Sequence, residues 1–255
     1  MAKTRTSRKR LDLLLVERGL AGSPQRALAM ILAGEVQVDG QRAGAAGAVV
    51  ASDARVELNS RARKYASRGG FKLQGALEDF AIPVQGRICL DVGSSTGGFT
   101  DCLLQNGAAR VIAIDTGYGQ MDFKLRQDSR VRLLEKTNAR YLKSEAIGEN
   151  VNLIVIDVAF ISATLVLPAT VNAAFPRCPD ERHGRQAIVL VKPQFEAGRE
   201  FVGKGGIVRD EAAQFAAVEK VKRALLDLAC TQTDVIESPI LGAEGNREFL
   251  LRGLF

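Results

Sequence analysis

Four ionisable residues stand at the ends of apolar segments where they could do chemistry together. Lys72 opens a helical pattern, Asp157 and Lys192 each end an apolar run, and Glu248 precedes another. Alone, an ionisable strand-end residue is usually a solvated one. Together, at one edge of a parallel sheet, the four would converge on a single cleft. Their charges are expected to be partly hydrated there.

Two lysines beside two carboxylates could together remove a proton from a hydroxyl group. A lysine can act as a base only if its pKa is lowered, which partial burial and a second cation both do. We therefore expect Lys192 to be the base and Lys72 to lower its pKa. Asp157 would hold Lys192, and Glu248 would orient Lys72 or the substrate. The roles of the two lysines can be exchanged in this scheme, because the groups of such a site titrate as a set.

The stretch LDVGSSTGGFTD, residues 90–101, predicts a ligand-binding turn between a strand and a helix. It lacks the second glycine of the dinucleotide fingerprint GxGxxG, and Phe99 stands where a phosphate loop needs lysine. A cationic ligand with an amino-acid end fits better, which favours S-adenosylmethionine over a dinucleotide or a nucleotide triphosphate. The residues of this turn expected to bind it are Asp91, Gly93, Ser94, Ser95, Thr96, Gly97, Gly98 and Phe99.

Later strand ends add further ligand-binding candidates. Asp115 ends the next apolar run, 24 residues after Asp91, a spacing that suits an acid bonding the ribose hydroxyls of an adenosine. Asn138 follows a third run and is expected to meet the adenine, and Asp157 is expected near the methyl group. Taken singly, each of these acids is more often a turn or capping residue. Their positions at separate strand ends make the ligand site the better interpretation.

The elements that must carry these residues alternate between strand and helix. Apolar runs at 87–92, 110–115, 131–135, 151–157 and 186–192 are separated by helical patterns, and two more strands are expected at the end of the chain. Such alternation predicts an α/β fold, with a mostly parallel, Rossmann-like sheet covered on both faces.

The first 72 residues differ from this body in charge. They hold 14 Lys and Arg against six Asp and Glu, a net charge of +8, whereas the remaining residues carry −2 of the total of +6. Residues 10–40 predict two short helices, the second capped by Ser23 with Pro24 at its first position, and then a hairpin turning at Asp39–Gly40. This basic α+β unit indicates a polyanion partner.

The motif RLDLLL…GL…S…RA…I..GEVQVDG resembles the RNA-binding domain of the ribosomal-protein S-four type over roughly residues 8–58. The resemblance implies RNA contacts by Arg10, Arg26, Gln37 and Arg42. Pro24 departs from the pattern, which usually has arginine after the capping serine, and Arg26 is the expected substitute. A basic junction follows, and we expect RNA contacts there from Arg63, Lys64 and Arg68.

The motifs SRGGFKL, DVGSSTGGFTD, LVKPQFE, GKGGIVRD and GNREF, in this order, resemble the TlyA family of ribosomal RNA 2′-O-methyltransferases, whose body is FtsJ-like. The resemblance implies a class I methyltransferase sheet and the catalytic tetrad Lys72, Asp157, Lys192 and Glu248. It also implies methyl transfer from S-adenosylmethionine to a cytidine 2′-hydroxyl of small-subunit rRNA, with the large subunit as a second candidate. The expected domains are 1–60 for RNA binding, 61–68 as a basic linker, and 69–255 for methyl transfer.

Other classes of function are weighed against this one. A non-catalytic RNA-binding protein is disfavoured because all four tetrad positions are filled. TlyA-like proteins are often labelled haemolysins, but the apolar stretch 151–175 contains Asp157 and Pro168 and suits a buried strand and helix better than a membrane span. The four cysteines are widely spaced, so no metal site or disulfide framework is expected. We expect a cytoplasmic protein whose partners are ribosomal RNA or ribosomal subunits; the sequence does not predict its oligomeric state.

Overall fold

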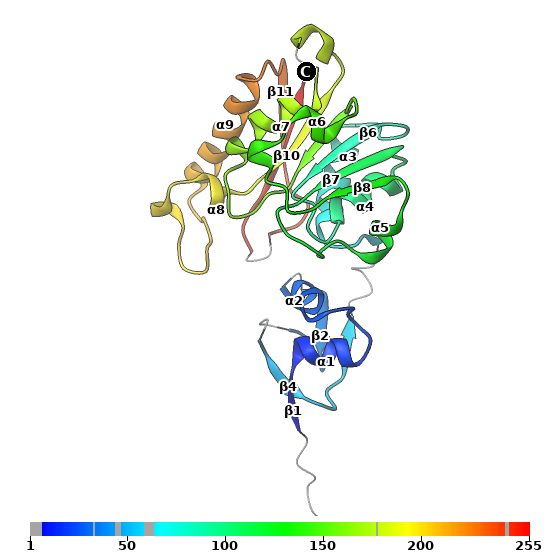
Figure 1. The fold of residues 1–255 in the computed structure, drawn as a ribbon. Helices are drawn as coiled ribbons and strands as arrows, with labels where there is room; N and C mark the ends of the chain where they lie inside the picture. The colour runs from blue at the N-terminus through cyan, green and yellow to red at the C-terminus, as the bar shows by residue number, and fades with distance from the viewer. Residues whose placement is uncertain (1–6, 33, 44–46, 59–63, 177, 243–244) are drawn as a thin grey trace, which may run out of the picture. The chain divides into compact units, whose positions relative to one another are not determined.

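The computed structural model describes residues 7–32, 34–43, 47–58, 64–176, 178–242 and 245–255. The chain forms two compact units, residues 1–68 and residues 69–255 (Figure 1). Residues 64–68 of the expected linker fall in the first unit, and residues 61–63 lie outside the described ranges.

The first unit is built from two short helices and two small antiparallel sheets. The helices pack through Leu11 and Leu15 on α1 and Ala27, Met30 and Ile31 on α2, as their spacing predicts. One sheet pairs β1 with β4, and the other has the order β3-β2-β5. The bounds are β1 Arg8–Arg10, α1 Leu11–Glu17, α2 Pro24–Leu32, β2 Val36–Val38, β3 Gln41–Arg42, β4 Val49–Ala51 and β5 Val56–Leu58.

Local sequence signals account for two features of this unit. The Ser23 hydroxyl accepts a hydrogen bond from the Arg26 backbone N–H at 3.1 Å, which confirms the predicted cap. Asp39 and Gly40 have φ angles of +51° and +80°, so the β2–β3 hairpin has the turn geometry that an Asp-Gly pair favours.

The second unit is organised around a seven-stranded sheet of order β11-β12-β10-β9-β6-β7-β8. The five strands from β10 to β8 are parallel, and β12 runs antiparallel to both β10 and β11. Counted from β6 as the first strand of this sheet, the order is that of the expected class I methyltransferase fold. The bounds are β6 Ile88–Val92, β7 Arg110–Ile114, β8 Val131–Leu134, β9 Leu153–Ile156, β10 Gln186–Val191, β11 Gln232–Glu237 and β12 Phe249–Leu254.

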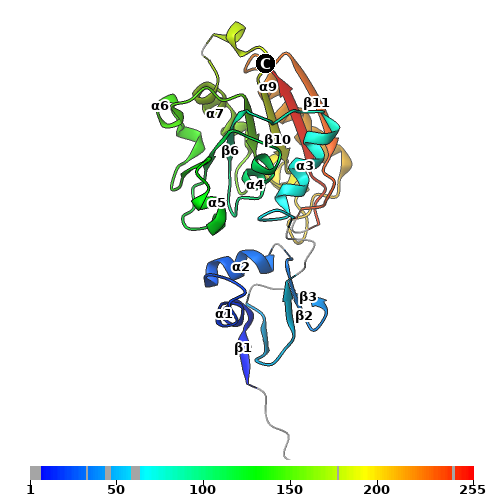
Figure 2. The same cartoon turned by 90° about the vertical axis from the view of Figure 1, so that its right-hand side faces the viewer.

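Helices cover both faces of this sheet. In Figures 1 and 2, α3 and α4 lie on one face and α6 and α7 on the other. Residues of α9 share an apolar core with α7 and with alternate side chains of the central strands, such as Leu90 and Ile154. The helices are α3 Gly69–Asp79, α4 Gly98–Gln105, α5 Phe123–Gln127, α6 Ser144–Ile147, α7 Leu167–Ala174, α8 Pro193–Glu196 and α9 Glu211–Leu226; short 3₁₀ turns are η2 Ala139–Tyr141, η3 Ala163–Leu165, η4 Pro179–Arg182 and η5 Arg199–Phe201.

The apolar stretch 151–175 is divided between several elements of this unit. It contributes β9, the turn η3 and the eight-residue α7. Within the described ranges, no helix combines the length and the apolar character that crossing a membrane requires.

Candidate active site

A cavity of about 400 Å³ opens at the carboxyl ends of β6, β7, β8 and β9. The chain leaves β6 toward β7 and β8 on one side and returns to place β9 on the other side of β6, so the cavity lies where the strand order reverses. Its size falls within the range of small-molecule sites. The polar residues of its lining are Ser95, Asp115, Thr116, Gln120, Thr137, Asn138 and Asp157.

The turn after β6 brings the backbone close to this cavity. Gly93 has a φ of +85°, and a Cβ there would collide with the Asp157 carbonyl oxygen. Gly97, with a φ of +94°, precedes α4 and packs against the Leu125 side chain. Gly93 and Ser95 line the cavity, whereas Ser94, Thr96, Gly97, Gly98 and Phe99 are not among its lining residues.

The cavity's two predicted adenosine contacts are held by the backbone. The Asp115 carboxylate accepts hydrogen bonds from the backbone N–H of Ser95, at 2.7 Å, and of Gly117, at 2.6 Å. Asn138 is exposed, and its side-chain oxygen accepts a hydrogen bond from the Arg140 backbone N–H at 3.0 Å, which caps η2. Both side chains line the cavity.

Asp91 lies beneath the turn and not in the cavity lining. It is fully buried and accepts a 2.6 Å hydrogen bond from the Thr100 hydroxyl on α4. Burial raises the pKa of Asp91 to about 7, against the Thr100 hydrogen bond, which lowers it. Asp91 therefore ties the strand to the helix and could act on a ligand only through the turn above it.

The predicted tetrad is assembled as two ion pairs. Lys192 Nζ lies 2.6 Å from Asp157 Oδ1, and Lys72 Nζ pairs with Glu248 Oε2. The first pair joins the ends of β9 and β10, and the second joins helix α3 to the start of β12. The expectation that the four charges are partly hydrated is wrong for Lys72 and Glu248, whose side chains are only 11% and 3% exposed. Each buried charge is instead compensated by its partner.

The two pairs also influence each other. Burial would raise the pKa of Asp157, but Lys192 and Lys72 together hold it below its usual range. Burial would lower the pKa of Lys192, but Asp157 and Glu248 outweigh it and the pKa is raised. The expected lowering of the Lys192 pKa by Lys72 is therefore wrong, because the nearby carboxylates dominate.

Sequence reasoning missed an anchor between the loops that follow β9 and β10. Glu196 accepts hydrogen bonds from the Ser162 hydroxyl and the Ala163 backbone N–H, both at 2.5 Å, and its carboxylate lies 3.1 Å from Lys220 Nζ. Phe160 is 93% exposed on the loop that Glu196 anchors, and its ring lies 5.5 Å from that of Phe195. In the sequence, the signal for this anchor was a serine shortly after β9 and a glutamate shortly after β10.

The predicted RNA contacts in the first unit have varied surroundings. Arg10 pairs with Asp12 at 2.7 Å, Arg26 Nη2 donates to the Ala66 carbonyl at 3.5 Å, and Arg42 is exposed on β3 with its guanidinium against Gly34. Gln37 is half-buried on β2.

Two of the three junction residues expected to contact RNA lie within the described ranges. Lys64 lies 5.0 Å from the centre of the Tyr65 ring, and Arg68 is half-buried. Arg63 lies outside the described residues.

Comparisons with known proteins agree with this geometry. The family profile described as FtsJ-like methyltransferase matches residues 65–255, and that of the S4 domain matches residues 9–56. A protein of Mycobacterium tuberculosis named 16S/23S rRNA (cytidine-2′-O)-methyltransferase TlyA is 47% identical over 245 residues, which cover 96% of this chain and 89% of the relative. This chain belongs to the TlyA family of FtsJ-like methyltransferases.

Proteins with another name are also similar to this chain over most of its length. Hemolysin A of Brachyspira hyodysenteriae is 38% identical over 94% of this chain and 98% of its own length. A solved structure from Streptococcus thermophilus, also given the name hemolysin, is 38% identical, covers 98% of this chain and 89% of its own, and has a TM-score of 0.72. Proteins of both names are thus similar in sequence to this chain, and the solved one shares its fold.

Proposed function

We propose that this protein transfers a methyl group from S-adenosylmethionine to the 2′-hydroxyl of a cytidine in ribosomal RNA. The observation that carries the proposal is the place of Asp157, which lines the cavity and also pairs with Lys192. One residue therefore joins the cofactor candidate site to the tetrad. The name of the Mycobacterium tuberculosis relative supports the cytidine target and both ribosomal subunits as substrates.

The residues of the cavity fit S-adenosylmethionine. Between the lining residues Gly93 and Ser95, the buried Ser94 hydroxyl finds no hydrogen-bond partner among the described residues, and Gly93 lets the turn lie against the Asp157 carbonyl. Asp115 would bind the ribose hydroxyls and Asn138 the adenine, while Asp157 would face the sulfonium end. When bound, the cofactor would supply a methyl carbon that a ribose oxygen can attack, with the neutral thioether as the leaving group.

The chain's own residues would orient the ribose and remove its proton. The hydroxyl proton passes to Lys192 Nζ in this proposal, which requires that Lys192 first give up its own proton. Because Asp157 and Glu248 favour the charged form of Lys192, the neutral form is scarce. Lys72, fixed by Glu248, orients the hydroxyl, and much of the rate comes from holding the reacting groups in line.

Substrate RNA would be held by both units. The S4 unit supplies the basic side chains proposed to contact phosphates, Arg10, Arg26 and Arg42 among them. On the body, the exposed Phe160 lies on the loop that carries Asp157 and offers a face on which an unstacked base could rest. Because ribosomal RNA is the proposed substrate, the cytoplasm is the proposed place of action.

Methyl incorporation into purified ribosomal subunits and naked rRNA tests this function directly. We expect labelled 2′-O-methylcytidine after digestion to nucleosides, and the two substrates show which form is used. Asp157→Asn should abolish the product without removing RNA binding. Label in a base or in another nucleoside would refute the proposed reaction.

A further inference from the structure

Glu248 is held in place by the connection between β11 and β12, described at residues 238–242 and 245–248. Its backbone carbonyl accepts the Ser238 N–H at 2.8 Å. A Cβ at Gly242 would collide with the Glu248 carboxylate, so this glycine makes room for the charged group. On α3, which carries Lys72, Gly75 packs so closely that a Cβ there would lie 2.8 Å from Pro239 Cγ. The connection is thus fitted around the Lys72–Glu248 pair.

Asn246 binds this connection to the segment that precedes α9. Its side chain is 1% exposed. Its amide nitrogen donates to the Gly206 carbonyl at 2.9 Å, and its amide oxygen accepts the Val208 N–H at 3.0 Å. Its backbone carbonyl accepts the Gly242 N–H at 2.9 Å. A single buried side chain therefore satisfies backbone groups that burial would otherwise leave unpaired.

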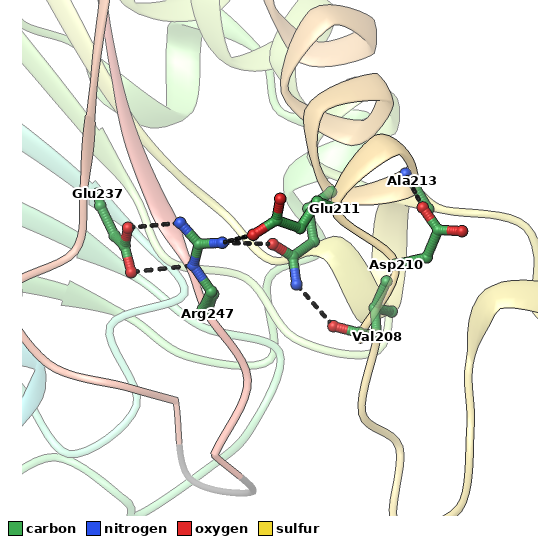
Figure 3. A network of polar contacts seen from close by, with 7 residues as sticks. Val208, Asp210, Glu211, Ala213, Glu237 and Arg247 are labelled. Atoms are coloured by element: carbon green, nitrogen blue, oxygen red, sulfur yellow. Dashed lines mark hydrogen bonds and ion pairs between the residues drawn. The ribbon is translucent and has the colours of Figure 1, made fainter.

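Arg247 reaches a different set of partners, as Figure 3 shows. Its Nε and Nη2 donate to the two carboxylate oxygens of Glu237 on β11, at 3.1 and 2.8 Å. Its Nη1 lies 3.2 Å from Glu211 and 3.3 Å from the side-chain oxygen of Gln214, both on α9. The buried Gln214 in turn donates to the Val208 carbonyl at 2.8 Å. Asn246 thus contacts the segment before α9 directly, and Arg247 reaches it through Gln214.

We propose that Asn246 and Arg247 are positioning residues for methyl transfer, acting through Glu248 on Lys72. Together with Glu237, Glu211 and Gln214 they form what we call the Arg247 clasp. The clasp fixes the start of β12 to β11 and α9, so that the Glu248 carboxylate faces Lys72 and not solvent. This inference rests on the proposed function for its rate measurements but not for its structural ones.

The chemistry of the clasp requires arginine. A guanidinium forms two parallel hydrogen bonds with one carboxylate and still has a donor for α9, whereas a lysine ammonium keeps the charge without this fork. Arg252, on β12 itself, provides a matched control. Its Nε and Nη2 contact Asp234 on β11 at 3.0 and 2.5 Å, and its Nη1 donates to the Phe80 carbonyl at 3.0 Å. It lies near the opposite end of β12 from Glu248.

The test compares Arg247→Lys with Arg252→Lys in the full chain. Under single turnover with saturating S-adenosylmethionine, Arg247→Lys should methylate rRNA more slowly by roughly tenfold to a hundredfold, the scale of a misplaced reacting group. Cofactor affinity and the KM for RNA should stay unchanged. Arg252→Lys should lose comparable thermal stability but no rate. In a Glu248→Gln background, Arg247→Lys should add little further loss, because both changes act through one group.

Amide hydrogen exchange gives a readout that does not depend on activity. In Arg247→Lys, the amides of Val208, Ser238 and Gly242, which donate to Asn246 and Glu248, should exchange faster than in Arg252→Lys. A rate equal to that of the wild type, or losses that multiply in full with Glu248→Gln, would overturn the positioning role. If the wild type methylates no rRNA, the proposed function fails, and unchanged exchange in Arg247→Lys would separately overturn the clasp.

Discussion

At the scale of single residues, the pairing of charges decides how the site can work. Lys192 and Lys72 each face a carboxylate, so the buried charges are compensated. Asp157 and Glu248 also stabilise Lys192 as a cation. A base must be neutral to accept a proton. The two ion pairs therefore fix the orientation of the four side chains. Lys192 must lose a proton before it can act as a base, and Asp157 and Glu248 oppose that loss.

The pH dependence of methyl transfer follows from this arrangement. Because the pKa of Lys192 is raised, the neutral fraction increases through the whole neutral range. The single-turnover rate should rise by about tenfold per pH unit from about pH 7 to about pH 9, and Lys192→Arg should remain inactive throughout. A native rate in Lys192→Arg would move the base to Lys72 or to water.

Asp91 predicts an unusual effect of pH on stability. Its folded pKa of about 7 lies above the usual 3.8, so the folded chain keeps a proton that the unfolded chain releases. Stability should then fall as pH rises from about 4 to about 7, by at most about 1.4 kcal/mol per pH unit from this group.

Thermal unfolding of Asp91→Asn against the wild type measures this effect. The difference in melting temperature should shift in favour of the variant as pH rises and level off above about pH 7. Asp79→Asn, an exposed change on α3, should show no such trend. A constant difference for Asp91→Asn would mean that Asp91 is ionised in the folded chain throughout.

The sequence could identify the tetrad residues but not their energetics. Position at a strand end is visible in the apolar pattern, and Asp157 with Lys192 was correctly expected to pair. Burial of Lys72 and Glu248 depends on how the 238–248 connection packs against α3, which no local pattern records. The same holds for Glu196, whose partners lie 33 and 34 residues away.

At the scale of elements, the turn from β6 to α4 determines what the cavity can accept. Gly93 and Gly97 adopt positive φ angles, and Gly93 brings the backbone against the β9 loop. The strands of this unit were predicted well because buried parallel strands are continuous apolar runs. The short elements α5, α6 and α8 were not predicted, since four or five residues carry too little periodicity.

Gly93→Ala tests the role of this turn, with Gly86→Ala as its matched control. Both glycines have positive φ, +85° and +73°, so each alanine should cost roughly 1–3 kcal/mol of stability through backbone strain. Only the Cβ at position 93 would collide with the Asp157 carbonyl, whereas position 86 has open space around it. Calorimetry should therefore show weaker S-adenosylmethionine binding for Gly93→Ala alone. Equal binding by the two variants would remove the turn from the cofactor site.

At the scale of the whole molecule, charge and chemistry belong to different units. The first unit carries the basic surplus, and the second contains the sheet, the cavity and the tetrad. The strong charge asymmetry was visible in the sequence because it needs only a count. The second unit keeps its own apolar core, so it should fold without the first.

Removing residues 1–63 should therefore separate RNA affinity from cofactor binding. The shortened chain should bind S-adenosylmethionine as the full chain does but lose most of its affinity for rRNA. Binding by the full chain should fall steeply with salt, since phosphate contacts release counterions, and the slope should flatten on truncation. An unchanged affinity and salt slope would show that the body alone binds the RNA.

The central claim is that this chain methylates a cytidine ribose in ribosomal RNA with the tetrad built on Asp157 and Lys192. Ribose-methylation mapping of rRNA, from cells with and without the chain, measures that outcome most directly. We predict at least one cytidine whose 2′-O-methyl group requires the wild-type chain and is absent when Asp157→Asn is expressed at the same level. An identical methylation pattern with and without the chain, or full methylation by Asp157→Asn, would contradict the account.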